Sequence, residues 1–172
     1  MPAIPRPAPD EYAPYFGGYI GEVPPGDVLE ILERQMAETQ DLLRGLPTSR
    51  AMHRYAPGKW SIKEVVGHLS DTERIFTYRA LCFSRSERAP LPGFEEDDYV
   101  AAAGFDARPL AELARELETV RAATLTLFRG LSDEALLRRG TANGKEFTVR
   151  AIAYIVAGHE RHHVRVLRER YL

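Results

Sequence analysis

The sequence has almost no cysteine and no long apolar run, and each absence excludes a class of protein. Cys82 is the only cysteine among the 172 residues, so no disulfide can form within the chain, which is typical of a reducing cytosol. The longest apolar run, residues 151–157, is far shorter than the roughly 20 residues that cross a bilayer. The N-terminus lacks the charged-then-apolar pattern of a secretion signal. We therefore expect a soluble, cytoplasmic protein with no membrane association.

An excess of positive charge is also missing. The formal net charge is −2 and the sequence pI is about 6.2. Binding to a phosphate backbone needs a strongly basic surface, so this balance disfavours a nucleic-acid-binding protein. With 44% hydrophobic and 28% charged residues, the composition is that of an ordinary globular domain, and the length fits one domain.

The first 26 residues differ from the rest in composition. They contain seven of the twelve prolines, which fix φ and remove backbone donors, so we expect no helix there. They also hold the aromatic residues Tyr12, Tyr15, Phe16 and Tyr19, and disordered tails are poor in aromatics. The pattern predicts an extended N-terminal arm, residues 1–26, whose rings pack on the main body.

Residues 27–172 contain four long segments in which apolar residues recur at helical spacing. We predict helices over about 27–43, 61–83, 109–129 and 148–170, with short helical segments near 94–104 and 133–138. Asp27 is a plausible N-cap, and Ser61 with Glu64 forms the pattern of a capping box. The segment 140–145 is expected to be a turn, and no strand of convincing length appears. The fold class is therefore all-α, a four-helix bundle preceded by the arm.

The fourth predicted helix carries three of the five histidines. His159 and His163 are one turn apart and lie on the same face as the apolar residues Ile152 and Val156. Burying two imidazoles without polar partners is costly. A divalent metal ion would provide a partner, because each imidazole could coordinate it through one ring nitrogen. His162 projects to the side, and we expect it at the surface. Hydrogen-bonded core or surface histidines are the alternative for the pair.

His68 adds a third imidazole on the second predicted helix. If the second and fourth helices face each other, three ring nitrogens converge, as in metal sites that keep open positions for water or substrate. Asp71 follows His68 by three residues and is the candidate catalytic group near the metal. The spacing of Glu73 and Glu160 turns them away, and we expect them to be surface charges.

Three other features suggest chemistry, but a simpler role is expected for each. Cys82 lies fourteen residues after His68, about 20 Å along a helix, so we expect a small buried side chain with no catalytic role. The acidic run at residues 95–98 suits an exposed helix start. The last helix carries Arg161, Arg165, Arg168 and Arg170, which either complement the helix dipole, as we expect, or form an anion-recognising rim.

Two segments resemble the DinB/YfiT-like superfamily: residues 60–69, WSIKEVVGHL, and residues 158–163, GHERHH. The short runs Leu91-Pro92-Gly93-Phe94 and Asn143-Gly144-Lys145 are also similar to that family. The resemblance implies an up-and-down-type four-helix bundle, often a homodimer, which binds a divalent metal, commonly zinc or nickel. Carried over, the ligands are His68, His159 and His163. Some relatives use a low-molecular-weight thiol in transferase or isomerase reactions.

Two kinds of function follow for such a site. A metal held by three imidazoles favours the anionic form of a nucleophile, which predicts a hydrolase or a thiol S-transferase acting on a small molecule. The sequence contains no recognisable general acid–base pair, so a non-catalytic, metal-containing ligand-binding or stress-response dimer is the alternative. A purely structural bundle with core histidines is a third hypothesis.

Overall fold

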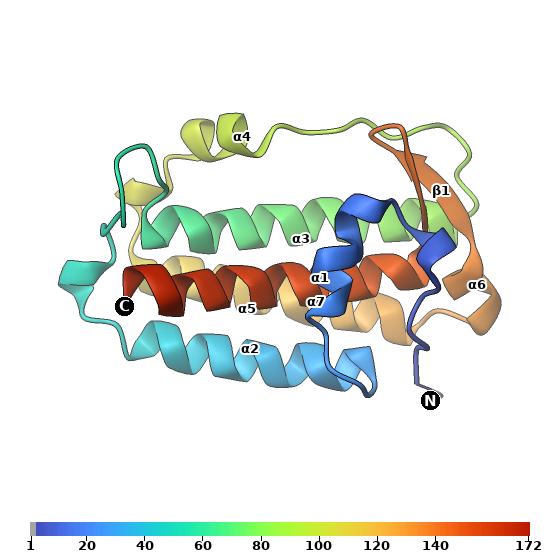
Figure 1. The fold of residues 1–172 in the computed structure, drawn as a ribbon, viewed down its shortest axis with the longest axis horizontal. Coiled ribbons are helices and arrows are strands. Elements are labelled where there is room, and N and C mark those ends of the chain that lie inside the picture. Colours follow the sequence, from blue (N-terminus) through green and yellow to red (C-terminus); the bar gives the residue numbers. More distant parts are fainter. Residues whose placement is uncertain (1–2) are drawn as a thin grey trace.

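The computed structural model describes residues 3–172, so the first two residues of the expected arm lie outside the described part. Four long helices form a bundle: α2 (Val28–Arg44), α3 (Ile62–Ser84), α5 (Leu110–Arg129) and α7 (Val149–Val166) (Figure 1). A π-helical turn, Leu167–Tyr171, continues α7. All four predicted helices are confirmed, with bounds that differ from the predicted ones by a few residues. No helix within residues 3–172 is long and apolar enough to cross a membrane.

Side-chain caps explain where three of the long helices begin. Asp27 Oδ1 accepts a hydrogen bond from the backbone N–H of Leu29 at the start of α2. At the start of α3, the Ser61 hydroxyl accepts from the backbone of Glu64, and the Glu64 carboxylate accepts from the backbone of Ser61, which confirms the capping box. Thr148 caps α7 through Ala151. These polar contacts satisfy backbone donors that have no partner inside the helix.

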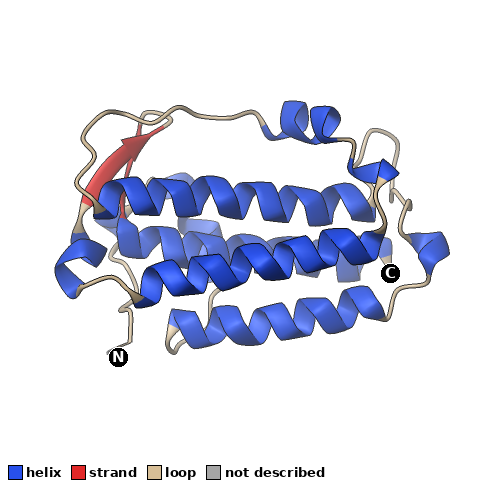
Figure 2. Ribbon diagram, turned by 180° about the vertical axis from the view of Figure 1, so that it is seen from behind, coloured by secondary structure: helices blue, strands red, loops and turns tan. Residues whose placement is uncertain are grey.

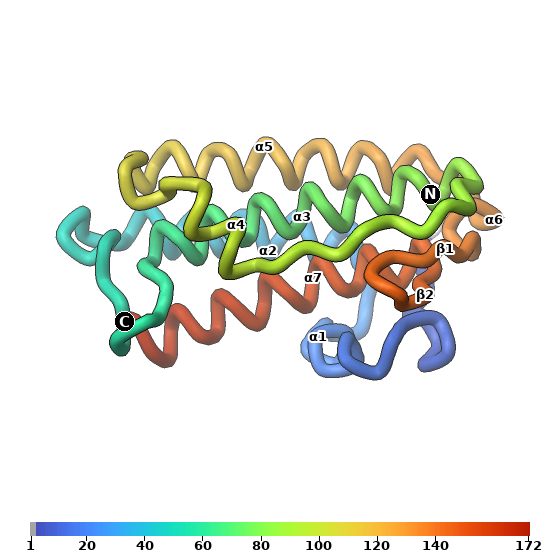
Figure 3. The backbone as a smooth tube through the Cα atoms, turned by 90° about the horizontal axis from the view of Figure 1, so that it is seen from above, coloured from blue at the N-terminus to red at the C-terminus, as the bar shows by residue number. Residues whose placement is uncertain are grey.

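The order of the helices in the bundle differs from the up-and-down arrangement that the resemblance implies. The helices α3 and α5 are neighbours that run in the same direction, as do α2 and α7 (Figures 1 and 3). The connection between α3 and α5 makes this possible, because it returns along the whole bundle before α5 begins (Figure 3). It includes α4 (Glu96–Ala103), which confirms the short helix expected there.

The N-terminal arm is not extended throughout, which corrects the expectation of no helix. It contains two 3₁₀ turns, Pro9–Glu11 and Pro14–Phe16, followed by the short helix α1 (Gly17–Gly21). Proline is tolerated here because it occupies the first position of each 3₁₀ turn, where no helical donor is lost. The expected packing of the rings is confirmed. Phe16, for example, contacts the rings of Phe76 and Phe147, with centroids 5.9 and 5.2 Å away.

The arm lies so close to α7 that only glycine fits at one position. A Cβ atom on Gly158 would come within 2.0 Å of the Tyr19 carbonyl oxygen. The α1 helix therefore lies directly on α7, one residue before His159.

A small β-hairpin, which the sequence did not predict as strands, stands at one end of the bundle (Figure 2). The strands β1 (Arg139–Ala142) and β2 (Lys145–Thr148) pair antiparallel across Asn143 and Gly144, whose φ angles are 50° and 67°. The expected turn is thus confirmed, but each strand has four residues, too few for a visible alternation. The hairpin follows α6 (Asp133–Leu137) and holds the returning connection by a 2.9 Å hydrogen bond from Leu91 N to Thr141 O.

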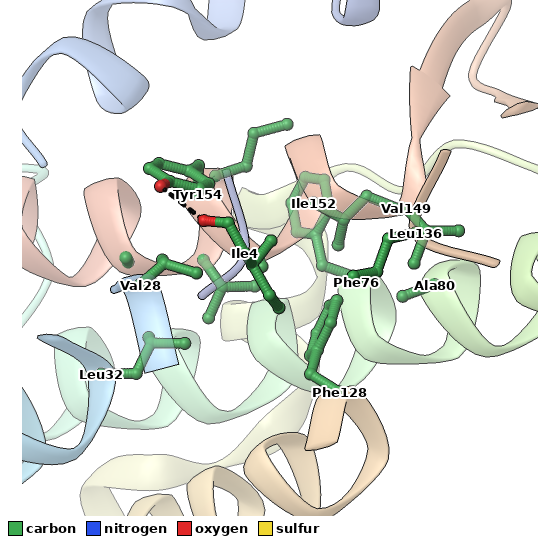
Figure 4. Close-up of a cluster of buried hydrophobic side chains, with 14 of the residues drawn as sticks. Ile4, Val28, Leu32, Phe76, Ala80, Phe128, Leu136, Val149, Ile152 and Tyr154 are labelled. Atoms are coloured by element: carbon green, nitrogen blue, oxygen red, sulfur yellow. Dashed lines mark hydrogen bonds between the residues drawn. The ribbon is translucent and has the colours of Figure 1, made fainter. Parts of the chain in front are cut away.

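The larger of the two apolar clusters lies toward the hairpin end of the bundle, between the long helices and the arm. Phe76, Phe128 and Ile152 meet there from three different helices (Figure 4). The arm closes this cluster, because the Tyr154 hydroxyl donates a hydrogen bond of 3.1 Å to the carbonyl of Ile4. The arm is therefore part of the core rather than an appendage.

Candidate metal centre

Three histidine side chains from two antiparallel helices converge inside the bundle. His159 Nε2 lies 3.1 Å from both His68 Nε2 and His163 Nε2, and one ring nitrogen from each residue lies within 4.8 Å of the other two. His68 and His159 are buried, and His163 is partly buried. The sequence placed these residues on inward faces, and α3 and α7 pack against each other as that hypothesis required.

Hydrogen bonds alone do not satisfy this cluster. A neutral imidazole nitrogen carries either one proton or one lone pair, so His159 Nε2 cannot donate to one neighbour and accept from the other. If it accepts from both, its single lone pair cannot point at two N–H groups at once. Three lone pairs directed at one cation would satisfy all three nitrogens at once. This donor set therefore fits a divalent metal ion, and zinc and nickel both accept imidazole ligands.

Burial keeps the three imidazoles in the neutral form that a metal requires. It lowers the pKa of His68 to about 4, although Asp97 opposes the shift. Burial, with the neighbouring charge of His68, lowers the pKa of His163 to about 3. For His159, burial is again the main cause, and its pKa is well below the usual value. All three rings are thus uncharged at neutral pH.

Aromatic side chains enclose the histidines on two sides. The indole of Trp60 packs against the His68 ring, with centroids 4.6 Å apart, and stacks on His163 at 6.4 Å. Tyr19 of the arm packs edge-on against His159 at 5.6 Å. These ring contacts restrict how the imidazole planes can turn.

The carboxylate of Asp71, the candidate catalytic group, pairs with an arginine rather than with the three histidines. Its carboxylate is 3.5 Å from Arg74 and belongs to a cluster with Glu116 of α5. Burial raises its pKa. Among residues 3–172, no hydrogen bond or ion pair joins Asp71 to a histidine of the cluster. Three residues along a helix leave a side chain about 60° from its starting direction, and here that difference brings Asp71 to Arg74 and the side of α3 that faces Glu116 of α5.

Glu73 and Glu160 are buried, which corrects the expectation of surface charges. Both carboxylates bind Arg121 of α5: Glu73 accepts two hydrogen bonds of 2.8 Å, and Glu160 Oε2 lies 3.0 Å from Arg121 Nη1. The exposed fractions are 1% for Arg121, 3% for Glu73 and 2% for Glu160. From α2, Gln35 and Thr39 donate hydrogen bonds to Glu160, so all four long helices meet here.

Arg121 was not predicted to be buried, although the sequence contains a signal for it. Arg121 falls four residues after Leu117 and seven before Phe128, on the apolar face of its helix. A charged residue on such a face needs a buried partner. Glu160 follows His159 directly, so this ion cluster also fixes α7 next to the histidines.

The other residues considered from the sequence lie outside the cluster of three histidines. His162 faces Glu22 and Arg165, and His53 packs edge-on against Tyr171. Cys82 is partly buried against the apolar core, as expected. Arg161 and Arg165 bind the backbone and side chain of Glu22 in the arm.

A cavity of about 310 Å³ reaches the edge of the cluster at His159. Its walls come from α3, the arm, the hairpin and the returning connection, which includes residues 94–97. The acidic run therefore lines this cavity and begins α4 at the same time. The side chains of Phe16, Tyr19 and Phe147 make much of the wall aromatic.

The model of the DinB superfamily matches residues 31–167, which is most of the chain. The chain belongs to the DinB superfamily. A search of the curated proteins finds no match.

Two solved structures have the same fold at low sequence identity. YfiT from Bacillus subtilis, described as a probable metal-dependent hydrolase with an unusual four-helix bundle topology, is 19% identical with a TM-score of 0.76. The match covers 90% of this chain and 94% of YfiT. A mycothiol-dependent maleylpyruvate isomerase is 13% identical with a TM-score of 0.68, and the match covers 84% of this chain and 61% of the isomerase.

Proposed function

We propose that this protein is a metal-dependent enzyme that acts on a small molecule through His68, His159 and His163, as a hydrolase or as a thiol S-transferase. The observation that carries the proposal is the convergence of three ring nitrogens from two helices, with separations of 3.1 Å that hydrogen bonding alone does not account for. Structural histidines in a core pair with backbone or carboxylate groups, and here they face one another instead.

Zinc or nickel in this site would supply a positive charge that favours the anionic form of a water or thiol nucleophile. The chain's own residues provide the rest. Trp60 and Tyr19 hold the imidazole planes, and the cavity beside His159 offers room for a substrate. The buried Arg121 cluster fixes the register of α7 against the other helices.

The relatives support both reaction types. YfiT, which this chain matches over nearly its full length, is described as a probable metal-dependent hydrolase, which supports hydrolysis. The isomerase depends on mycothiol, which supports a low-molecular-weight thiol as co-substrate.

One observation favours the non-catalytic alternative, a metal-containing ligand-binding or stress-response protein. Within the part of the chain that the structure describes, the three histidines have no carboxylate in their ligand group, and Asp71 faces α5. A ligand-binding protein needs no proton acceptor beside the histidines. In an enzyme, the substrate, the thiol or solvent would have to accept the proton.

Elemental analysis and turnover assays test the proposal. Protein purified without a histidine tag should contain a stoichiometric divalent metal, which His163→Ala should lose and His162→Ala should keep, since His162 is the adjacent histidine outside the cluster. Ester hydrolysis, and conjugation of thiols to 1-chloro-2,4-dinitrobenzene, are then measured on the metal-loaded protein. Equal turnover by the two variants would remove the metal from the reaction. Saturable ligand binding without product would establish the alternative.

Two further expectations stay predictions. The homodimer rests on the resemblance alone and is tested by sedimentation equilibrium. The cytoplasmic location is tested by fractionating cells that produce the protein at its natural level.

A further inference from the structure

The cavity beside His159 contains a buried arginine that no acid neutralises. Arg79 of α3 is 5% exposed, and one of its donors binds the Pro92 carbonyl at 3.0 Å. The rings of Phe76 and Phe94 lie 5.1 and 5.9 Å from its guanidinium carbon. Within residues 3–172, no carboxylate lies within 4.0 Å of Arg79, unlike buried Arg121, which has two. An arginine has five N–H donors, so most of those on Arg79 remain for a ligand.

A second cation lines the same part of the cavity. Lys145 of the hairpin is partly buried, and its Nζ lies 5.1 Å from the ring centroid of Tyr15 and 6.0 Å from that of Phe16. In the described part of the chain it also has no ion pair. The Asn143 side chain stands next to it in the cavity wall. Neither cation forms an ion pair with the acids that line the same cavity, so both remain available to an anionic ligand.

The opposite charge gathers toward the histidines. Glu95, Glu96 and Asp97 line the cavity as well, at the start of α4, which lies away from the hairpin (Figure 3). Burial, together with Asp97 and Glu95, raises the pKa of Glu96. The cavity is therefore polarised, with acids toward the metal centre and cations toward the hairpin.

The spacing along α3 sets the length of a ligand. Thr72, Phe76 and Arg79 follow one another on the cavity side of the helix, and Arg79 lies eleven residues after His68, about 16 Å along the axis. Aromatic rings of the arm and hairpin fill the wall between the two ends. A flat apolar body fits this middle section, since aromatic walls favour such groups.

We propose that the cavity binds an elongated organic carboxylate, with the carboxylate on Arg79 and Lys145, an apolar or unsaturated body between the aromatic walls, and the other end toward the histidines. The planar guanidinium suits a carboxylate, which accepts two parallel hydrogen bonds. The assignment of the other end as the reacting end rests on the proposed function. The anion subsite itself depends only on the residues of the cavity.

Isothermal titration with a matched pair of probes tests the subsite. The probes are 4-phenylbutanoate and 4-phenylbutanamide, which differ in charge but hardly in shape. Both are titrated into the protein as purified and into chelator-treated protein, so that a carboxylate bound to metal is distinguished from one bound to Arg79. We expect the acid to bind at least about tenfold more tightly than the amide in both forms, as charge-assisted hydrogen bonds imply.

Substitutions test which residues cause the preference for the acid over the amide. Arg79→Met should abolish the preference for the acid, and Lys145→Met should reduce it. Arg115→Met, which removes an exposed arginine of α5, should keep it. Circular dichroism confirms that each variant is folded, and the surface hairpin variant Lys145→Met remains informative if Arg79→Met unfolds. Equal binding of acid and amide, a preference that survives both cavity variants, or no saturable binding in the millimolar range would overturn the proposal. The preference for the acid is expected even if the protein binds no metal. The proposed metal-dependent function and the proposed anion subsite can therefore fail independently of each other.

Discussion

The Nε2 atoms of His68 and His159 lie 3.1 Å apart, although 91 residues separate them in the chain. They meet because α3 and α7 run in opposite directions and pack side by side (Figures 1 and 3). His163 joins them from the next turn of α7, with its ring nitrogen 3.1 Å from that of His159. A ligand at this point would link two helices that no disulfide or short loop connects.

Metal removal should therefore lower the melting temperature. A ligand that binds only the folded state stabilises it, and at a hundredfold excess over Kd the gain is about 2.7 kcal/mol, or roughly 5–10 °C for a chain of this length. We expect dialysis against a chelator to produce such a decrease in the wild type and in His162→Ala. His163→Ala should show none. An unchanged wild-type transition, after dialysis long enough for a slowly released metal, would contradict tight binding.

Replacing Arg121 should destabilise the whole bundle. Arg121→Met leaves the carboxylates of Glu73 and Glu160 buried without their cation, and breaking a buried pair in this way costs about 3–5 kcal/mol. Urea unfolding at neutral pH measures the loss. Arg129→Met is the control on the same helix, since Arg129 pairs with Glu33 at the exposed surface and should contribute at most about 1 kcal/mol. Similar losses in the two variants would show that burial of the cluster does not matter.

Glu11 should make stability depend on pH in the acid range. Burial alone would raise its pKa, but hydrogen bonds from Arg150, the Ala8 backbone and Thr148 outweigh it and lower the pKa from 4.5 to about 2. Because the folded-state pKa is the lower one, Glu11 stabilises the fold above pH 4.5. That contribution, on the order of 3 kcal/mol, is lost as the pH falls from about 4.5 to about 2.

Urea midpoints measured between pH 7 and pH 3 test this for Glu11→Gln. The variant should be less stable at pH 7 and should lose less stability on acidification than the wild type. Asp10→Asn is the control, because Asp10 is the exposed neighbour and its side chain is 76% exposed. If Glu11→Gln followed the wild-type pH profile, the acid dependence would originate elsewhere.

Adding one methyl group to Gly158 should detach the arm. The Cβ of Gly158→Ala would lie 2.0 Å from the backbone oxygen of Tyr19, so α1 or α7 must move. We expect chymotrypsin to cleave faster at the aromatic residues of the arm while the bundle stays folded. Mass spectrometry measures the rate and the sites of this cleavage. Gly18→Ala, where a Cβ would meet nothing within 4 Å, should leave the arm protected. Equal cleavage of the two variants would mean that the close approach at Gly158 does not hold the arm.

Local sequence patterns were sufficient for the helices and for the faces on which the histidines lie. The Ser61–Glu64 capping box and the apolar periodicity act over one or two turns, so they are visible in the sequence without a partner. The same periodicity placed His159 and His163 on the inward face of α7. For His68, only the helix face could be predicted, and its meeting with the other two histidines depended on the packing of α3 against α7.

The four helices, their caps and the inward faces of the three imidazoles could therefore be predicted, because these features follow from interactions between residues a few positions apart. Four other features could not be predicted in this way: α3 and α5 run parallel, Asp71 turns toward α5, Arg121 joins Glu73 and Glu160, and the arm forms α1 over Gly158. Each of these depends on which distant surfaces come into contact. That choice is set by the total burial of the bundle and by the path of its long connection, and no local pattern encodes it.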